Sequence, residues 1–156
     1  MAEYSANAIQ TVAPNGSVIF TESPVPCTRG LIYHRDESGI FRLASPTAIG
    51  CGCTRACNNM STANYTTSFH ANIAIPEGGD VEEIQLAITI DGETDPSSIM
   101  RFTPADVDVY GNVGAEIVVA VPCICRCSSV SVRNVSTQDI LVQNANIVFS
   151  FDGVKR

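Results

Sequence analysis

The chain has 156 residues, of which 45% are hydrophobic and 16% charged, and its nine basic and sixteen acidic residues give a formal net charge of −7. This length and composition predict one globular domain without disordered tracts. The acidic balance excludes nucleic-acid binding through phosphates and disfavours anionic membrane surfaces, and no segment approaches the roughly 20 apolar residues of a membrane-spanning helix.

The first nine residues are predicted to form an N-terminal arm ahead of a single domain of residues 10–156. An acid, Glu3, stands where a signal peptide would carry positive charge, and no apolar segment follows it. The arm is polar and precedes the first β-branched run, which is typical of segments that become ordered on a partner. We therefore expect it to dock the protein on a larger particle, and we expect no export through a signal peptide.

Short β-branched runs separated by turn residues follow one another along the rest of the chain. The runs are residues 17–21, 31–34, 39–43, 66–75, 84–90, 98–103, 117–121, 129–135 and 140–151. Turn chemistry between them includes Pro14-Asn-Gly, Pro76-Glu-Gly-Gly and Asp91-Gly. The best helix candidate, residues 104–109, is very short. About ten short strands in one domain predict an all-β sandwich or barrel.

Two runs carry a hydrophobic pattern that points to contact with another subunit. In residues 84–90 every second residue from Ile84 is apolar, and the opposite face is only mildly polar. In residues 140–151 strict alternation puts Val142 and Val148 on one face and Ile147 and Phe149 on the other, so both faces are apolar. The residues predicted to lie in a subunit interface are Ile84, Leu86, Val142, Phe149 and Phe151.

Seven cysteines are the strongest chemical signal in the sequence. Six form two clusters, the first cluster being Cys51, Cys53 and Cys57 and the second cluster being Cys123, Cys125 and Cys127. Spacing by two places the second cluster on one face of a strand, where neighbours are badly placed to bond one another. The seventh, Cys27, stands alone. Because an odd count leaves one cysteine over, Cys27 is the candidate to stay free or to pair with another subunit.

Three interpretations of the cysteine clusters remain open. Disulfides could join the first cluster to the second, or join two chains. A zinc ion could be held by Cys51, Cys53, Cys123 and Cys125, although this spacing is not the commonest one for structural zinc. Reduced thiols could act as small apolar side chains in the core.

Enzymatic motifs are lacking, and no cofactor is expected. His34 and His70 are the only histidines, and neither lies in a metal-binding or nucleophile-activating context. Both are interpreted as structural. The acidic segment from Asp91 to Asp95 could hold calcium loosely, but Asp-Gly also marks a hairpin turn. The sequence therefore predicts no catalytic residue.

The order of the strands, the Asn-rich closing strand 142–149 and the segment 71–79 resemble the jelly roll of tumour necrosis factor, complement globular heads and spore-surface glycoprotein tips. The opening stretch 4–12 resembles small surface or virion proteins of gut Firmicutes and their phages. This resemblance implies a ten-stranded jelly-roll sandwich that forms a homotrimer for display or adhesion. The cysteine clusters are not part of that family pattern, and no collagen-like stalk is present.

A non-enzymatic, trimeric phage capsid decoration or head-fibre subunit on the virion exterior is the function we predict, in contact with other particle proteins. Synthesis in the cytosol without a signal peptide, followed by exposure to an oxidising exterior, accounts for the cysteines. The first alternative is a spore or cell-surface subunit, filamentous or adhesive and cross-linked through cysteines. The second is a metal- or glycan-binding module, which the same fold could carry on its loops.

Overall fold

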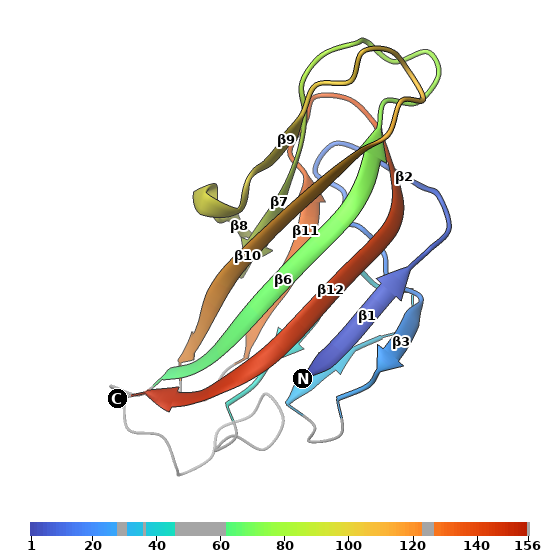
Figure 1. The fold of residues 1–156 in the computed structure, drawn as a ribbon. Helices are drawn as coiled ribbons and strands as arrows, with labels where there is room; N and C mark the ends of the chain where they lie inside the picture. The colour runs from blue at the N-terminus through green and yellow to red at the C-terminus, as the bar shows by residue number, and fades with distance from the viewer. Residues whose placement is uncertain (28–30, 36, 46–61, 123–126, 156) are drawn as a thin grey trace.

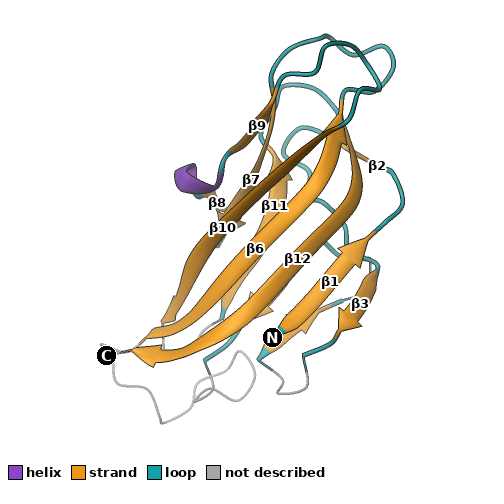
Figure 2. Ribbon diagram, in the orientation of Figure 1, coloured by secondary structure: helices purple, strands orange, loops and turns teal. Residues whose placement is uncertain are grey.

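The computed structural model describes residues 1–27, 31–35, 37–45, 62–122 and 127–155, and strands dominate this part of the chain (Figure 2). Twelve strands and one 3-10 turn are present among these residues, where the sequence predicted about ten strands. They form two antiparallel sheets that lie over one another as the layers of a sandwich (Figure 1). The predicted all-β architecture is therefore confirmed.

The first sheet, sheet A, contains the longest strands. Its order is β10, β6, β12, β1 and β3, and β2 also pairs with β12. The bounds are β1 (Ala2–Ala6), β2 (Gln10–Val12), β3 (Glu22–Val25), β6 (Thr62–Ala74), β10 (Gly111–Pro122) and β12 (Ile140–Lys155). Because β10 is first in the order, it forms one edge of the sheet.

The second sheet, sheet B, is built from shorter strands. Its order is β4, β5, β11, β7 and β8, and β9 also pairs with β7. The bounds are β4 (Ile32–His34), β5 (Phe41–Leu43), β7 (Ile84–Ile90), β8 (Glu93–Thr94), β9 (Met100–Phe102) and β11 (Ser128–Asn134), and the 3-10 turn η1 is Pro96–Ser98. Consecutive strands often change sheet, as from β6 to β7 and from β11 to β12.

An aromatic cluster occupies the core between the sheets. Phe41 of β5 lies at its centre, with its ring centroid 4.8 Å from that of Tyr4, 5.2 Å from that of Phe20 and 5.0 Å from that of Phe149. All four side chains are buried. Tilted and edge-on arrangements at these separations are favourable for aromatic pairs. The cluster therefore joins β1 and β12 of sheet A to β5 of sheet B.

The strand predicted over residues 84–90 is confirmed with the same bounds in β7. Ile84, Leu86 and Ile88 enter the core as the alternation requires. The opposite face was expected to contact another subunit, and this expectation is wrong for its central residues. Ala87 and Thr89 are buried within the protomer, and the Thr89 hydroxyl bonds to Ser131 of the adjacent β11.

The last strand, β12, departs from strict alternation. Val142 points into the core, but so do Ala145, Ile147 and Phe149, which the sequence placed on the other face. The pairing of β12 with β6 shifts register between Gln143 and Asn146, and Asn144 adopts a positive φ of 53°. An extra residue of this kind is a β-bulge, and it exchanges the two faces of the strand beyond it.

The predicted N-terminal arm is instead part of the sandwich, which corrects the boundary at residue 9. Residues Ala2–Ala6 form β1, which pairs with β12 on one side and β3 on the other. Ala2, Tyr4 and Ala6 are buried, and they belong to the hydrophobic core. Because alternate side chains of β1 are buried and β1 pairs with a strand on each side, we expect this segment to stay in the sandwich.

The helix candidate at residues 104–109 is a non-helical connection that ends in a turn with Asp108 at a φ of 56°. The 3-10 turn lies earlier, at η1, where the Asp95 carboxylate accepts a hydrogen bond from the Ser97 amide at 2.8 Å. Within the described ranges no helix is long and apolar enough to cross a membrane.

Asn134, at the end of β11, is a fully buried polar side chain with three hydrogen bonds. Its amide nitrogen donates to the carbonyl oxygens of Val12, at 2.9 Å, and Gln138, at 2.8 Å. Its side-chain oxygen accepts from the Ser136 amide at 2.8 Å. The residue thereby joins β2, β11 and the loop before β12.

Replacing Asn134 with Ala is expected to lower the free energy of unfolding by about 2–4 kcal/mol, because buried backbone groups lose their partners at roughly 1–3 kcal/mol each. Urea unfolding followed by circular dichroism measures this loss. The matched control is Asn112→Ala, since Asn112 is exposed and its side chain makes one hydrogen bond, to Asn72. A loss for Asn134→Ala no larger than that of the control would contradict the expectation.

Candidate functional site

The outer face of sheet B carries all the arginine side chains that the structure describes. Arg42 lies on β5, Arg133 on β11 and Arg101 on β9, and Arg35 follows β4 by one residue. Side chains alternate along a strand, and the residues on either side of Arg42, Arg101 and Arg133 point into the core or are buried. The arginines of the described residues are thus gathered on one surface.

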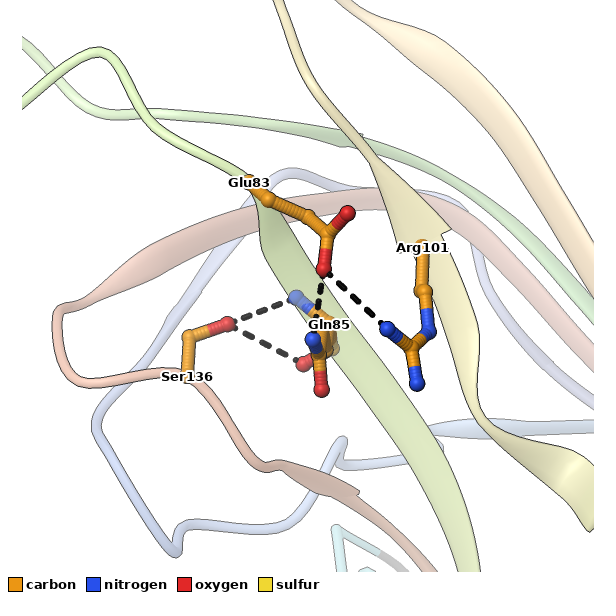
Figure 3. A network of polar contacts seen from close by, with 4 residues as sticks. All are labelled: Glu83, Gln85, Arg101 and Ser136. Carbon is orange, nitrogen blue, oxygen red and sulfur yellow. Dashed lines mark hydrogen bonds and ion pairs between the residues drawn. The ribbon is translucent and has the colours of Figure 1, made fainter. Parts of the chain in front are cut away.

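Arg101 is the arginine with an ion pair among the described residues. Its guanidinium Nη1 lies 3.6 Å from Glu83, whose carboxylate also accepts a hydrogen bond from the Gln85 side-chain amide at 2.7 Å (Figure 3). Ser136 bonds to the backbone of Gln85 beside this group. The charge of Arg101 is therefore already compensated within the protomer.

Arg133 also has a partner on the protein. Its Nη1 donates to the carbonyl oxygen of Gly92 at 3.3 Å, and its Nε is buried without a hydrogen bond. Arg133 stands opposite Ala87 of β7 in the register of the sheet. Its side chain helps to cover the outer face of β7.

Arg35 and Arg42 border an open cavity of about 750 Å³ on the β4–β5 hairpin. The wall also includes Tyr33 and Ile40, which are 39% and 50% exposed. Their cavity, with two guanidinium groups and two exposed apolar side chains, is the candidate site. Among the described residues no ion pair involves Arg35 or Arg42.

The outer face of sheet A has the opposite charge. Glu3, Glu116 and Asp152 lie on β1, β10 and β12. Each carboxylate accepts a hydrogen bond from a neighbouring strand: Asn146 to Glu3 at 2.6 Å, Ser68 to Glu116 at 2.7 Å and Thr66 to Asp152 at 2.6 Å. Each of these three carboxylates therefore has a hydrogen-bond partner within the protomer.

The arrangement of strands matches a known architecture. The globular domain of zebrafish complement 1qA protein superposes with a TM-score of 0.55 and 12% sequence identity, over 94% of each chain. The chain folds as a jelly-roll β-sandwich. This confirms the fold class that the sequence resemblance implied, although identity this low indicates the fold alone.

Other similar structures are weaker matches to this jelly roll. The C-terminal domain of the sugar-binding protein EclA matches with a TM-score of 0.38 and 11% identity, over 92% of this chain and 79% of that one. A family 35 carbohydrate-binding module from Clostridium thermocellum matches at 0.36 and 11%, over 94% and 98%. No protein-family model and no curated protein matches the chain by sequence.

The residues predicted to form a subunit interface lie mainly inside the jelly roll, which corrects their assignment. Ile84, Leu86, Val142 and Phe149 have no exposed surface and belong to the core of a single protomer. Phe151 is partly buried and packs against the same core. Their hydrophobicity is explained by the contact between the two sheets, so an interface has to use other side chains.

Most of the predicted cysteine chemistry falls outside the described residues. Cys51, Cys53, Cys57, Cys123 and Cys125 lie there, so the zinc site and the bond between clusters stay predictions. Cys127 is disulfide-bonded. In the described part of the chain no group of three or more His, Cys, Asp or Glu side chains is placed to hold a metal ion.

Cys27 lines a second, smaller cavity of about 280 Å³ at one end of the jelly roll, beside Tyr65 and Phe151. Burial, with a smaller contribution from the nearby Cys27, raises the pKa of Tyr65 well above its usual range. Burial likewise raises the pKa of Tyr4. The Tyr65 hydroxyl donates a hydrogen bond to the carbonyl oxygen of Ala44. Both tyrosines therefore stay neutral and act as structural groups.

The two histidines differ in their surroundings. His34 stacks on Phe41 with 4.4 Å between ring centroids, and its Nε2 donates to the carbonyl oxygen of Ser38 at 2.9 Å. The ring is thereby fixed on the inner side of the hairpin. His70 is exposed on the outer face of sheet A, opposite Gly114 of β10. His34 has the structural role predicted for it.

The acidic segment after β7 forms a hairpin turn. Asp91 and Gly92 both have positive φ, 52° and 86°, and they connect the paired residues Ile90 and Glu93. Two residues of this conformation form the turn that matches the twist of a β-hairpin. The Asp91 carboxylate accepts a hydrogen bond from the Ser129 amide at 2.9 Å. The hairpin turn predicted from Asp91-Gly92 is thus confirmed, and the bond from Ser129 to the carboxylate was not predicted.

Proposed function

We propose that the protein is a non-enzymatic structural subunit that trimerises and decorates the exterior of a phage capsid, as a head-decoration or fibre protein. The observation that carries the proposal is the edge strand β10. It is 12 residues long and ends the strand order of sheet A. No strand of the described residues pairs with its outer edge. A long edge of this kind invites association, so soluble proteins shorten, charge or cover such edges.

The side chains of β10 also suit a contact with another protomer. Val118, near its middle, is 58% exposed, and its exposed neighbours on the same face are Glu116 and Ala120. Small and apolar groups on a flat strand allow a second protein surface to approach closely. One protomer's β10 against a different surface of the next makes a heterologous contact, which closes into a ring at three copies.

We expect the isolated protein to have a mass of about 50 kDa by light scattering, three times the 16.6 kDa of one chain. Val118→Arg is expected to reduce this mass to that of a monomer without unfolding, because the side chain is exposed and a buried unpaired charge is costly. The control is Val81→Arg in the loop between β6 and β7, where Val81 is 52% exposed. A monomeric wild-type protein at micromolar concentration, or a trimeric Val118→Arg, would count against this interface.

The location of the protein is a separate question with its own experiment. Gold-labelled antibodies against the folded protein should decorate the outside of phage heads in electron micrographs of an infected lysate. Labelling confined to spores or to the cell surface would instead support the alternative of a surface subunit cross-linked through cysteines. Neither result depends on the oligomeric state.

A further inference from the structure

We propose that the outer face of the β4–β5 hairpin binds an acidic saccharide, with Arg35 and Arg42 pairing with its carboxylate groups and Tyr33 packing on a sugar ring. This site is independent of the proposed trimer. These three side chains line the cavity of about 750 Å³ described above.

The register of the hairpin brings the four side chains together. Tyr33 is paired with Arg42, and His34 with Phe41. Arg35 directly follows β4, and Ile40 directly precedes β5. Tyr33 and Arg35 are two residues apart, as are Ile40 and Arg42, and all four point outward. Arg35 and Arg42 line the same cavity, together with Tyr33 and Ile40.

Neither guanidinium of this group has a partner among the residues that the structure describes. Across the described residues no hydrogen bond or ion pair reaches the side chain of Arg35 or Arg42. Glu37, in the turn of the same hairpin, forms no ion pair with them. In contrast, Arg101 and Arg133 on the same face are both engaged. Two neighbouring guanidinium groups without such partners are suited to bidentate recognition of carboxylates.

The apolar members of the group point to a saccharide. The exposed ring of Tyr33 has no aromatic partner among the described residues, and it lines the cavity together with Ile40, which is also exposed. Sugar rings combine apolar C–H faces with polar edges, which matches an aromatic ring set among arginines and Ser38. Ligand sites of this kind combine apolar walls with a few placed polar groups.

The size of the surface argues against a protein partner. Strands β4 and β5 are three residues each, so the hairpin face measures about 10 Å by 10 Å. A stable protein interface needs about 800 Å² on each side. A few sugar units fit the smaller area.

The test is calorimetric titration of the full chain with tetragalacturonate. We expect saturable binding that weakens as sodium chloride is raised, because exposed ion pairs are screened. Arg42→Gln is expected to weaken binding by about tenfold or more, since it removes a charge-assisted contact. Tyr33→Ala should weaken it severalfold. Arg101→Gln is the matched control, because it removes the same charge from the same face and should bind like the wild type.

Three results would overturn the proposal. The first is absence of saturable binding at millimolar tetragalacturonate by the folded protein. The second is equal loss of affinity in Arg42→Gln and Arg101→Gln, which would indicate a general effect of charge. The third is equally tight binding of neutral maltotetraose or of a glutamate tetrapeptide, which would show that the site recognises something other than an acidic sugar. Circular dichroism of each variant establishes that it is folded.

Discussion

Deletion of residues 1–9 is expected to abolish cooperative folding. Strand β1 lies between β12 and β3, and its removal would expose the edges of both. It would also remove the buried side chains of Ala2, Tyr4 and Ala6. Loss of a buried aromatic side chain alone costs about 3–5 kcal/mol. Because whole domains are stable by only about 5–15 kcal/mol, loss of the complete strand should leave little or no folded protein. Thermal unfolding followed by circular dichroism shows whether the truncated protein keeps a cooperative transition.

The matched substitutions are both on β1. Tyr4→Ala removes a ring that contacts Phe41 and His34, and it should be strongly destabilising. Glu3→Gln changes the neighbouring side chain, which points outward and accepts a hydrogen bond from Asn146, and it should change stability by less than about 1 kcal/mol. A truncated protein with a wild-type melting transition would show that β1 is dispensable and would restore the interpretation of these residues as an arm.

The fold class was predictable because apolar residues at every second position indicate a β-strand when the apolar runs of a chain are short. Ile84, Leu86 and Ile88 carry this pattern, and β7 has the predicted bounds. The first strand was missed because its buried positions are Ala2, Tyr4 and Ala6. Alanine has low β-propensity, and so the segment resembles a polar extension. The pairing with β12 that orders this segment involves residues far away in the sequence, so the residues of the segment do not reveal it.

The faces of β12 were not predictable for a different reason. Strict alternation from Val142 places Ile147 and Phe149 on the opposite face, whereas the structure buries all three together. The change depends on one residue, Asn144, in a positive φ conformation. Asparagine tolerates this conformation better than most residues, but its presence in a strand does not by itself signal a bulge. An apparent two-sided hydrophobic strand can therefore be a one-sided strand with a bulge.

The candidate site was only partly accessible from sequence. Both runs that become β4 and β5 were predicted, and six residues, 35–40, separate the two strands in the observed hairpin. A hairpin prediction would have placed Tyr33 beside Arg42. The sequence does not reveal that the guanidinium groups of Arg35 and Arg42 form no ion pair with the described residues, because Glu37 is close in the chain and could have neutralised them. That outcome depends on side-chain positions in the folded hairpin.

Phe41→Ala is expected to lower the free energy of unfolding by about 3–5 kcal/mol, as removal of a fully buried phenylalanine typically does. The ring of Phe41 contacts four others, and it is the link between the two sheets. The cavity left behind would be bordered by Tyr4 and Phe149, which are held by strands of sheet A and cannot collapse into it freely. Urea unfolding at equilibrium gives the change.

The control for Phe41 is Phe151→Ala, which removes the same atoms from a partly buried ring with one aromatic neighbour, Tyr65. It should cost clearly less than Phe41→Ala, because fewer contacts are lost and the site is open to solvent. Equal losses in the two variants would show that Phe41 is not the centre of the core. Phe41→Leu keeps most of the volume and should recover much of the stability. Since Phe41 and Arg42 are adjacent on β5, this variant should also keep the arginines of the hairpin in place.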